Sequence, residues 1–185
     1  MKHTFKITLL LLAMFLAAQL IGLFVVNQYL PDSTLLPYGM EPPKDVQPQS
    51  ASELVLSFAI AFTVVVVLMF VLSKYKAELF LRLWFFAVVV IAIGISINSV
   101  ILKLPNSSLI ALAISLPLAF FKIFRRNLVV HNLTELLVYP GIASIFVIML
   151  LAWTTSPLLA ISVILILISI YDMYAVWHTG FMQKM

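Results

Sequence analysis

One aspartate directly follows a long run of uncharged residues. Residues 136–171 carry no charged side chain, and Asp172 comes next. In a helix over residues 158–177, Asp172 lies about 21 Å along the axis and about 6 Å past the bilayer midplane. A carboxylate near the bilayer centre destabilises insertion by about 2.5–3.5 kcal/mol, so such a residue is by default a functional candidate. The other six acidic residues fall in loops or near the ends of apolar segments. Asp172 is therefore the residue to which the sequence assigns chemistry.

The helix around Asp172 has a stripe of small and polar residues. Ser162, Ser169, Asp172 and Ala175 follow helical spacing and share one broad face. We expect this face to point inward, because small residues let a neighbouring helix approach and let water reach the carboxyl. The alternative is that Asp172 is a neutral, hydrogen-bonded helix-packing residue. Tyr171 is a second candidate, either lining the site or lying as an aromatic residue near the membrane interface.

The composition predicts an integral membrane protein. Apolar residues make up 64% of the 185 residues and charged residues 10%, whereas a soluble domain has about 45–50% and about 25%. The net charge of +4 does not indicate nucleic-acid binding, because the basic residues lie in short segments between apolar runs. There is no cysteine, and the three histidines are scattered, so we expect no metal and no cofactor.

The apolar runs predict an all-α bundle of six transmembrane helices in one domain, 1–185. The run 136–171 is too long for one span of a bilayer about 30 Å thick, and the segment 153–157, which ends in Pro157, is the expected hinge. Residues 31–52, with five of the nine prolines, are expected to form an irregular outer loop. The expected spans are about 7–30, 54–73, 83–102, 107–124, 133–152 and 158–177.

Charge placement predicts the orientation of these spans. With six spans and a cytoplasmic N-terminus, nine of the 11 lysines and arginines fall on the cytoplasmic side, and only Lys44 and Lys103 fall outside. This asymmetry follows the positive-inside rule. We therefore expect both termini to be cytoplasmic, in a multi-pass protein of the cell membrane.

Other polar residues receive structural roles. Gln19, Asn98 and Ser99 lie inside apolar runs and are expected to form interhelical hydrogen bonds. Trp177 and His178 are expected to anchor the inner membrane boundary. His131, in a basic segment, is expected to be solvated or to contact lipid headgroups.

The sequence around Asp172 resembles the sixth-span motif of the presenilin and signal peptide peptidase family of intramembrane aspartyl proteases. The matching residues are Ile170-Tyr171-Asp172-Met173-Tyr174-Ala175-Val176, and residues 176–182 are similar to the same region of archaeal members. The resemblance implies that Asp172 is the first catalytic aspartate, that Tyr171 orients substrate, and that single-span membrane proteins are cleaved within the bilayer.

The family's second aspartate lies in a Gly-x-Gly-Asp motif that this sequence does not contain. Hydrolysis by this mechanism needs two carboxyls that share a proton. We therefore expect the chain to be the N-terminal part of the protease, to require a C-terminal half as partner, and to be inactive alone. Two other interpretations remain open: a proton- or cation-coupled transporter or channel component that uses Asp172, and a membrane scaffold in which Asp172 packs helices.

Overall fold

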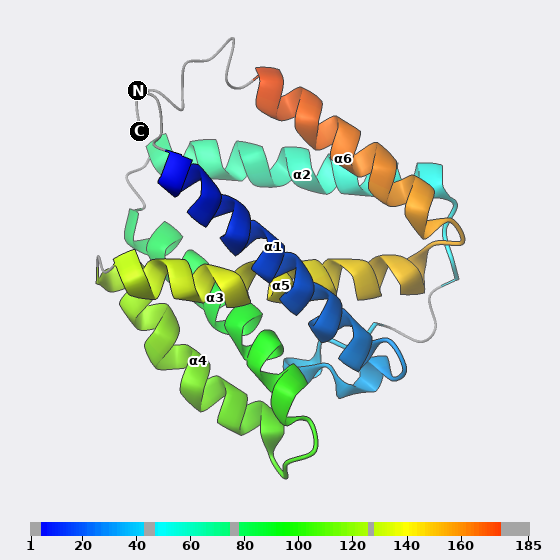
Figure 1. The fold of residues 1–185 in the computed structure, drawn as a ribbon. Helices are drawn as coiled ribbons and strands as arrows, with labels where there is room; N and C mark the ends of the chain where they lie inside the picture. Colours follow the sequence, from blue (N-terminus) through cyan, green and yellow to red (C-terminus); the bar gives the residue numbers. More distant parts are fainter. Residues whose placement is uncertain (1–4, 43–46, 75–77, 126–127, 175–185) are drawn as a thin grey trace. The chain divides into compact units, whose positions relative to one another are not determined.

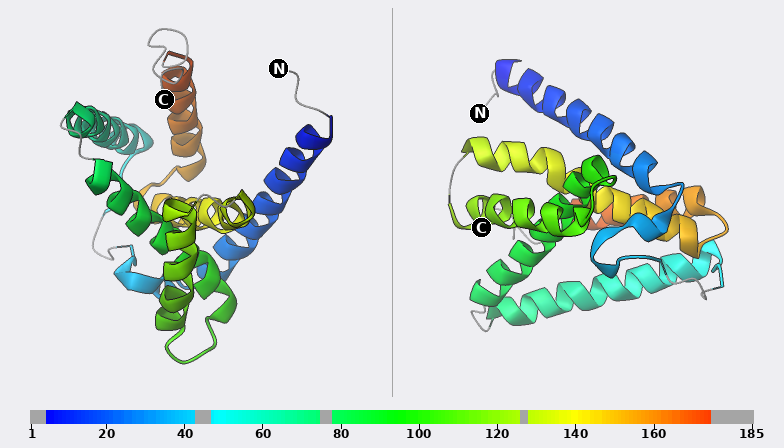
Figure 2. Two further views of the ribbon diagram at one scale, coloured as in Figure 1. Left: turned by 90° about the vertical axis from the view of Figure 1, so that its left-hand side faces the viewer. Right: turned by 90° about the horizontal axis from the view of Figure 1, so that it is seen from below.

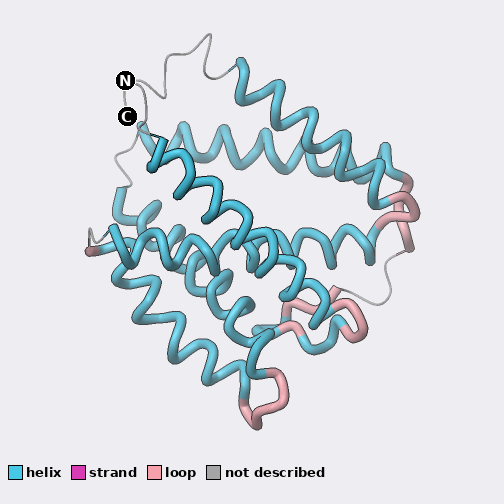
Figure 3. Tube along the Cα trace, viewed as in Figure 1, coloured by secondary structure: helices cyan, strands magenta, loops and turns pink. Residues whose placement is uncertain are grey.

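The computed structural model describes residues 5–42, 47–74, 78–125 and 128–174, and within them every regular element is helical (Figure 1; Figure 3). Five of the helices are long and apolar enough to cross a membrane, the pattern of a multi-pass membrane protein. The α-helices are α1 (Phe5–Tyr29), α2 (Ala51–Lys74), α3 (Glu78–Ile101), α4 (Ser107–Phe124), α5 (Leu128–Trp153) and α6 (Pro157–Tyr174).

The sixth helix is described over 18 residues, as many as α4. Its described apolar part is Pro157–Tyr171. The predicted end of this span at residue 177 lies outside the described residues, as do Ala175, Trp177, His178 and Lys44.

The described residues fall into two compact units. One contains residues 1–43 and 72–149, and the other contains residues 44–71 and 150–185. The first therefore holds α1, α3, α4 and most of α5, and the second holds most of α2 together with α6.

In the first unit, α3 is the central packing element. It forms a hairpin with α4 (Figure 2), and its buried residues Val89, Val90 and Ile93 pack with Ala119 of α4 and Val138 of α5. Close contact with α5 depends on Gly141, because a Cβ there would overlap the carbonyl oxygen of Ala92. The α3–α5 contact is also fixed by Ser96 Oγ, which donates to the Leu137 carbonyl at 2.6 Å.

The far end of α3 is held to α1 by buried hydrogen bonds. Tyr29 Oη donates to the Ile95 carbonyl at 2.9 Å and accepts from Asn98 Nδ2 at 3.0 Å. Both Tyr29 and Asn98 have no exposed surface. The interhelical hydrogen bond expected for Asn98 is confirmed, whereas Ser99 bonds within its own helix, to the Ser96 carbonyl at 2.7 Å.

The segment predicted as an irregular loop contains two short 3-10 helices, η1 (Ser33–Leu35) and η2 (Pro37–Gly39). Tyr38 adopts a left-handed conformation with φ of 65°, which is uncommon for a non-glycine residue. Its hydroxyl lies against Gly94 of α3, where a Cβ would clash with it. Burial raises the pKa of Tyr38 above the ordinary value for tyrosine. This part of the loop is therefore packed onto α3 and is not irregular.

Every helix except α4 begins earlier than predicted, and polar contacts near the first turns of α2 and α5 show why those segments are helical. At α2, Glu53 Oε2 accepts from Ser50 N at 3.0 Å while Glu53 N donates to Ser50 Oγ at 3.4 Å. This is a capping box, which starts the helix at Ala51 rather than residue 54. In α5, the His131–Glu135 pair and the Thr134 Oγ1 bond to the Val130 carbonyl satisfy polar groups inside the helix. The described part of α5 therefore includes residues 128–132, ahead of the predicted start at residue 133.

The predicted hinge before Pro157 is confirmed. Helix α5 ends at Trp153 and α6 begins at Pro157, a position where the missing proline N–H leaves no bond unmade. Thr154 Oγ1 accepts from Ser156 N at 3.2 Å, which supports the turn. Gln49 N donates to the Trp153 carbonyl at 2.8 Å, so the segment leading into α2 is joined to this hinge.

Candidate active site on α6

Position 172 lies in α6, as the sequence predicted, three residues before residue 175, where the described part of the chain stops. The side chain of Asp172 is outside the part of the chain that the structure describes. The described residues around that position lie on α6 and on α2 of the same unit, and they form the candidate site.

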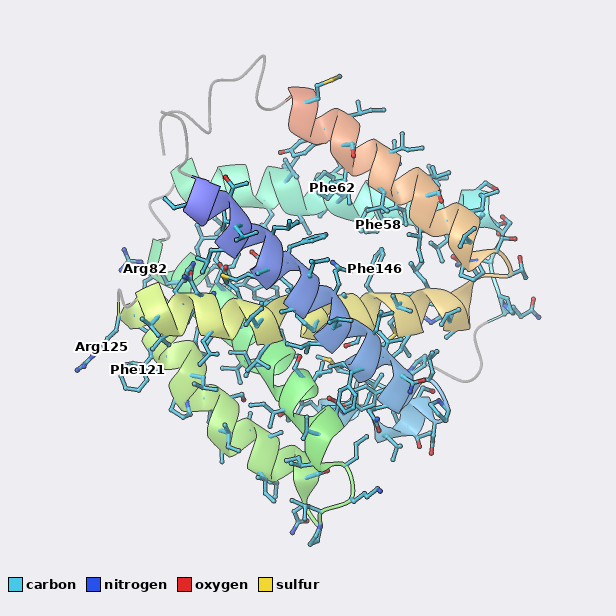
Figure 4. All side chains as sticks on the ribbon, in the orientation of Figure 1. Phe58, Phe62, Arg82, Phe121, Arg125 and Phe146 are labelled. Carbon is cyan, nitrogen blue, oxygen red and sulfur yellow. The ribbon has the colours of Figure 1, made fainter. Side chains whose placement is uncertain are left out.

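Tyr171 contacts α2 through an aromatic pair. Its ring meets that of Phe62 edge to face, with centroids 5.2 Å apart and planes at 86°. Phe62 in turn stacks with Phe58 one turn earlier on α2, with centroids 6.3 Å apart (Figure 4). Edge-to-face packing of this kind contributes about 0.5–1.5 kcal/mol beyond the burial of area. The pairing fixes Tyr171 on the α2 side of α6.

An apolar groove of about 330 Å³ runs between the two helices beside Tyr171. Phe58, Phe62 and Val66 contribute one wall from α2, and Leu167, Ile168 and Tyr171 contribute the other from α6. The volume is at the lower end of the range of about 300–1,000 Å³ that is typical of ligand pockets. Its lining is suited to aliphatic side chains, and Thr63 and Tyr171 are the lining residues that carry hydroxyl groups.

Within its own unit, the serine stripe of α6 does not pack against a neighbouring helix. Ser162 and Ser169 are both exposed, and the buried residues of α6 are Ala160 and Ile164. Each serine hydroxyl donates to the carbonyl four residues earlier in α6, at 2.8 Å. Because these bonds satisfy the hydroxyls within their own helix, the serines need no partner on a neighbouring helix.

Position 172 belongs to the same face of α6 as Ser169. Residues seven and three positions earlier, Leu165 and Ser169, share that face and are both exposed. Tyr171 lies about 100° around the helix from position 172. The described part of α6 therefore offers one face to α2 and leaves the face of residue 172 open to other segments.

No other described acidic residue in this unit comes from the same end of the helices. Glu53 is in the first turn of α2, near the hinge where α6 begins. Position 172 is 15 residues after Pro157, about 22 Å along α6. Glu53 Oε2 is also engaged by Ser50, through the backbone N–H at 3.0 Å and Oγ at 2.9 Å. Among the described residues of this unit, Glu53 therefore does not provide a carboxyl beside position 172.

The α2 wall of this groove was not predicted from the sequence. Phe58 and Phe62 were counted only as part of an apolar span, although their four-residue spacing places them on one face of α2. A second group was also missed: Lys122, His131 and Glu135 form an ion cluster in the other unit, at the end of α4 and the start of α5.

Comparison with protein-family models, with curated proteins and with solved structures finds no match for this chain.

Proposed function

We propose that this chain is the six-span, N-terminal part of a presenilin-type intramembrane aspartyl protease, with Asp172 as one of its two catalytic carboxyls. The observation that carries the proposal is the position of Asp172 in an apolar helix, directly after a tyrosine that lines a groove. An acid at such a position is unfavourable unless it has a function. The motif around it, residues 170–176, resembles that of the family.

The groove beside Tyr171 provides a place for substrate. An extended peptide segment from an unwound membrane helix has apolar side chains and exposed backbone groups that need hydrogen-bond partners. The aliphatic and aromatic walls suit those side chains, and the Tyr171 hydroxyl offers a donor and an acceptor to the backbone. Tyr171 is thus a positioning residue for the scissile peptide bond.

The open face of α6 is where the second carboxyl would approach. In this mechanism one carboxylate accepts a proton from water, the resulting hydroxide attacks the carbonyl carbon, and the protonated carboxyl polarises the carbonyl oxygen. The tetrahedral intermediate then collapses as the amide nitrogen is protonated and leaves. Two carboxyls about 3 Å apart titrate as a pair, so Asp172 alone does not perform the reaction. The isolated 185-residue chain is expected to be inactive.

The proposal includes an orientation. Both termini are cytoplasmic, α6 is the sixth span, and water reaches Asp172 from the cytoplasmic side of the cell membrane. The substrates are single-span membrane proteins, and the partner is a C-terminal half that supplies the second aspartate.

A photoreactive peptide isostere tests this function, because its hydroxyl group mimics the tetrahedral intermediate. The full gene product, in detergent, should be labelled within α2 or α6, and labelling should be lost in Asp172→Asn. Ser169→Ala is the matched control, since it lies one turn away on the same face and should label like the parent. Labelling that survives Asp172→Asn unchanged would contradict the proposal.

A further inference from the structure

The groove beside Tyr171 lies between two helices that are joined at one end. Gln49, two residues before α2, bonds to both sides of the hinge that precedes α6. Its N–H donates to the Trp153 carbonyl at 2.8 Å, and its carbonyl accepts from Thr155 N at 3.5 Å. From this joint α2 and α6 diverge (Figure 1). The groove is lined by residues 58–67 of α2 and 167–171 of α6, so it lies away from the joint, along the turns of α6 that precede position 172.

The chemistry of the lining excludes charge. None of the nine described residues that line the groove carries a charged side chain. One of the two hydroxyl groups among them is already engaged, because Thr63 Oγ1 donates to the Ala59 carbonyl at 2.8 Å. A charged side chain placed in the groove would lose its hydration without gaining an ion pair, which is strongly unfavourable. The groove therefore selects for an uncharged side chain.

The volume of the groove limits what it can hold. One turn of an α-helix with its side chains, about 10 Å wide and 5.4 Å long, occupies about 420 Å³, which is more than the groove's volume of about 330 Å³. A cavity of about 150 Å³ binds one benzene molecule, so the groove has room for one large aliphatic or aromatic side chain. A turn of an intact substrate helix does not fit, whereas a side chain from an extended segment does.

Ala59 is the smallest residue on the wall of the groove, and its side chain is half-buried. A longer side chain at position 59 would therefore occupy space that the groove now leaves open. Leu167 lies on the α6 wall and is 39% exposed, so shortening its side chain would enlarge the same space. We infer that the α2–α6 groove holds one large uncharged side chain of the substrate, next to the scissile bond, and that Ala59 sets the upper limit on its size. This inference rests on the proposed function, because the substrate is the one that Asp172 would cleave.

Competition binding with a set of peptide isosteres tests this inference. Each isostere carries a hydroxyl group in place of the scissile bond, and the set differs only in one neighbouring side chain, which is that of alanine, leucine, phenylalanine or lysine. Each isostere competes with the photoreactive isostere for the full gene product in detergent. The parent should bind the leucine and phenylalanine isosteres at least tenfold more tightly than the alanine and lysine isosteres, because only a large apolar side chain fills the groove.

Two substitutions should move this preference in opposite directions. Ala59→Leu shrinks the groove and should weaken binding of the phenylalanine isostere about tenfold while leaving the alanine isostere unchanged. Leu167→Ala enlarges the groove and should raise the preference for phenylalanine over leucine. Ala61→Leu and Ile166→Ala are the matched controls, since both residues are exposed on the same helices and lie outside the groove lining. Both controls should bind every isostere like the parent.

Failure of this inference is distinguishable from failure of the proposed function. Equal binding of the four isosteres by a parent whose photolabelling depends on Asp172 would overturn the inference and leave the function standing. A side-chain preference that Ala59→Leu and Leu167→Ala both leave unchanged would do the same, and Leu167→Ala alone decides if Ala59→Leu does not fold. Photolabelling that survives Asp172→Asn unchanged would overturn both, because the bound side chain would then have no scissile bond beside it.

Discussion

Replacing Tyr29 with phenylalanine removes one oxygen atom and two buried hydrogen bonds. The hydroxyl donates to the Ile95 carbonyl at 2.9 Å and accepts from Asn98 Nδ2 at 3.0 Å. The phenyl ring remains, so little apolar contact is lost. Hydrogen bonds between membrane helices contribute about 0.6 kcal/mol on average and about 1.7 kcal/mol at most. Two of them therefore suggest that Tyr29→Phe lowers the free energy of unfolding by about 1–3 kcal/mol.

The assay is reversible unfolding in mixed micelles at increasing fractions of denaturing detergent, followed by circular dichroism. Tyr139→Phe is the matched control, because Tyr139 is 59% exposed and its change should stay within about 0.5 kcal/mol. A double-mutant cycle with Asn98→Leu should give a coupling energy of about 0.5–1.5 kcal/mol. Strictly additive effects of the two substitutions would refute the reasoning that Tyr29 and Asn98 act through their shared hydrogen bond.

Three further substitutions test the packing. Gly141→Ala should destabilise the protein by about 1–3 kcal/mol in the same unfolding assay, because its Cβ overlaps an α3 carbonyl oxygen; parent-like stability would disprove the close α3–α5 approach. Gly94→Ala should displace the Tyr38 ring from α3, which faster proteolysis of the 30–43 loop would report and unchanged proteolysis would contradict. Phe62→Leu should loosen Tyr171, seen as weaker near-ultraviolet dichroism at nearly unchanged stability, whereas an unaltered spectrum would argue against the aromatic pair.

The positions of the helices could be predicted because the hydrophobicity of a segment decides whether it can lie in the membrane. A segment that must lie in hydrocarbon is apolar throughout, and the loop between α1 and α2, the hinge before Pro157 and the α3–α4 turn interrupt the apolar runs. The helix starts could not be predicted as well. A prediction based on uninterrupted apolar runs places Glu53 and His131 in loops. In the structure both residues lie in helices, where Glu53 forms the capping box and His131 pairs with Glu135.

The candidate site was predictable only in part. Helical spacing shows which residues share a face, but it does not show which neighbour that face meets. The pairing of Tyr171 with Phe62 joins segments far apart in the chain, which no local pattern reports. The serine stripe shows a related limit of local patterns: Ser169 satisfies its hydroxyl on its own helix, so a polar face is not by itself evidence of a buried one.

The central claim is that Asp172 is one carboxyl of a catalytic pair, and cleavage of a labelled single-span substrate by the full gene product tests it most directly. The parent should release product, Asp172→Asn should release none above background, and a hydroxyl-containing transition-state mimic should block the parent. Cleavage by Asp172→Asn at the parental rate would contradict the claim. The carboxyl would then have a packing or ion-binding role, and the transporter interpretation would take first place.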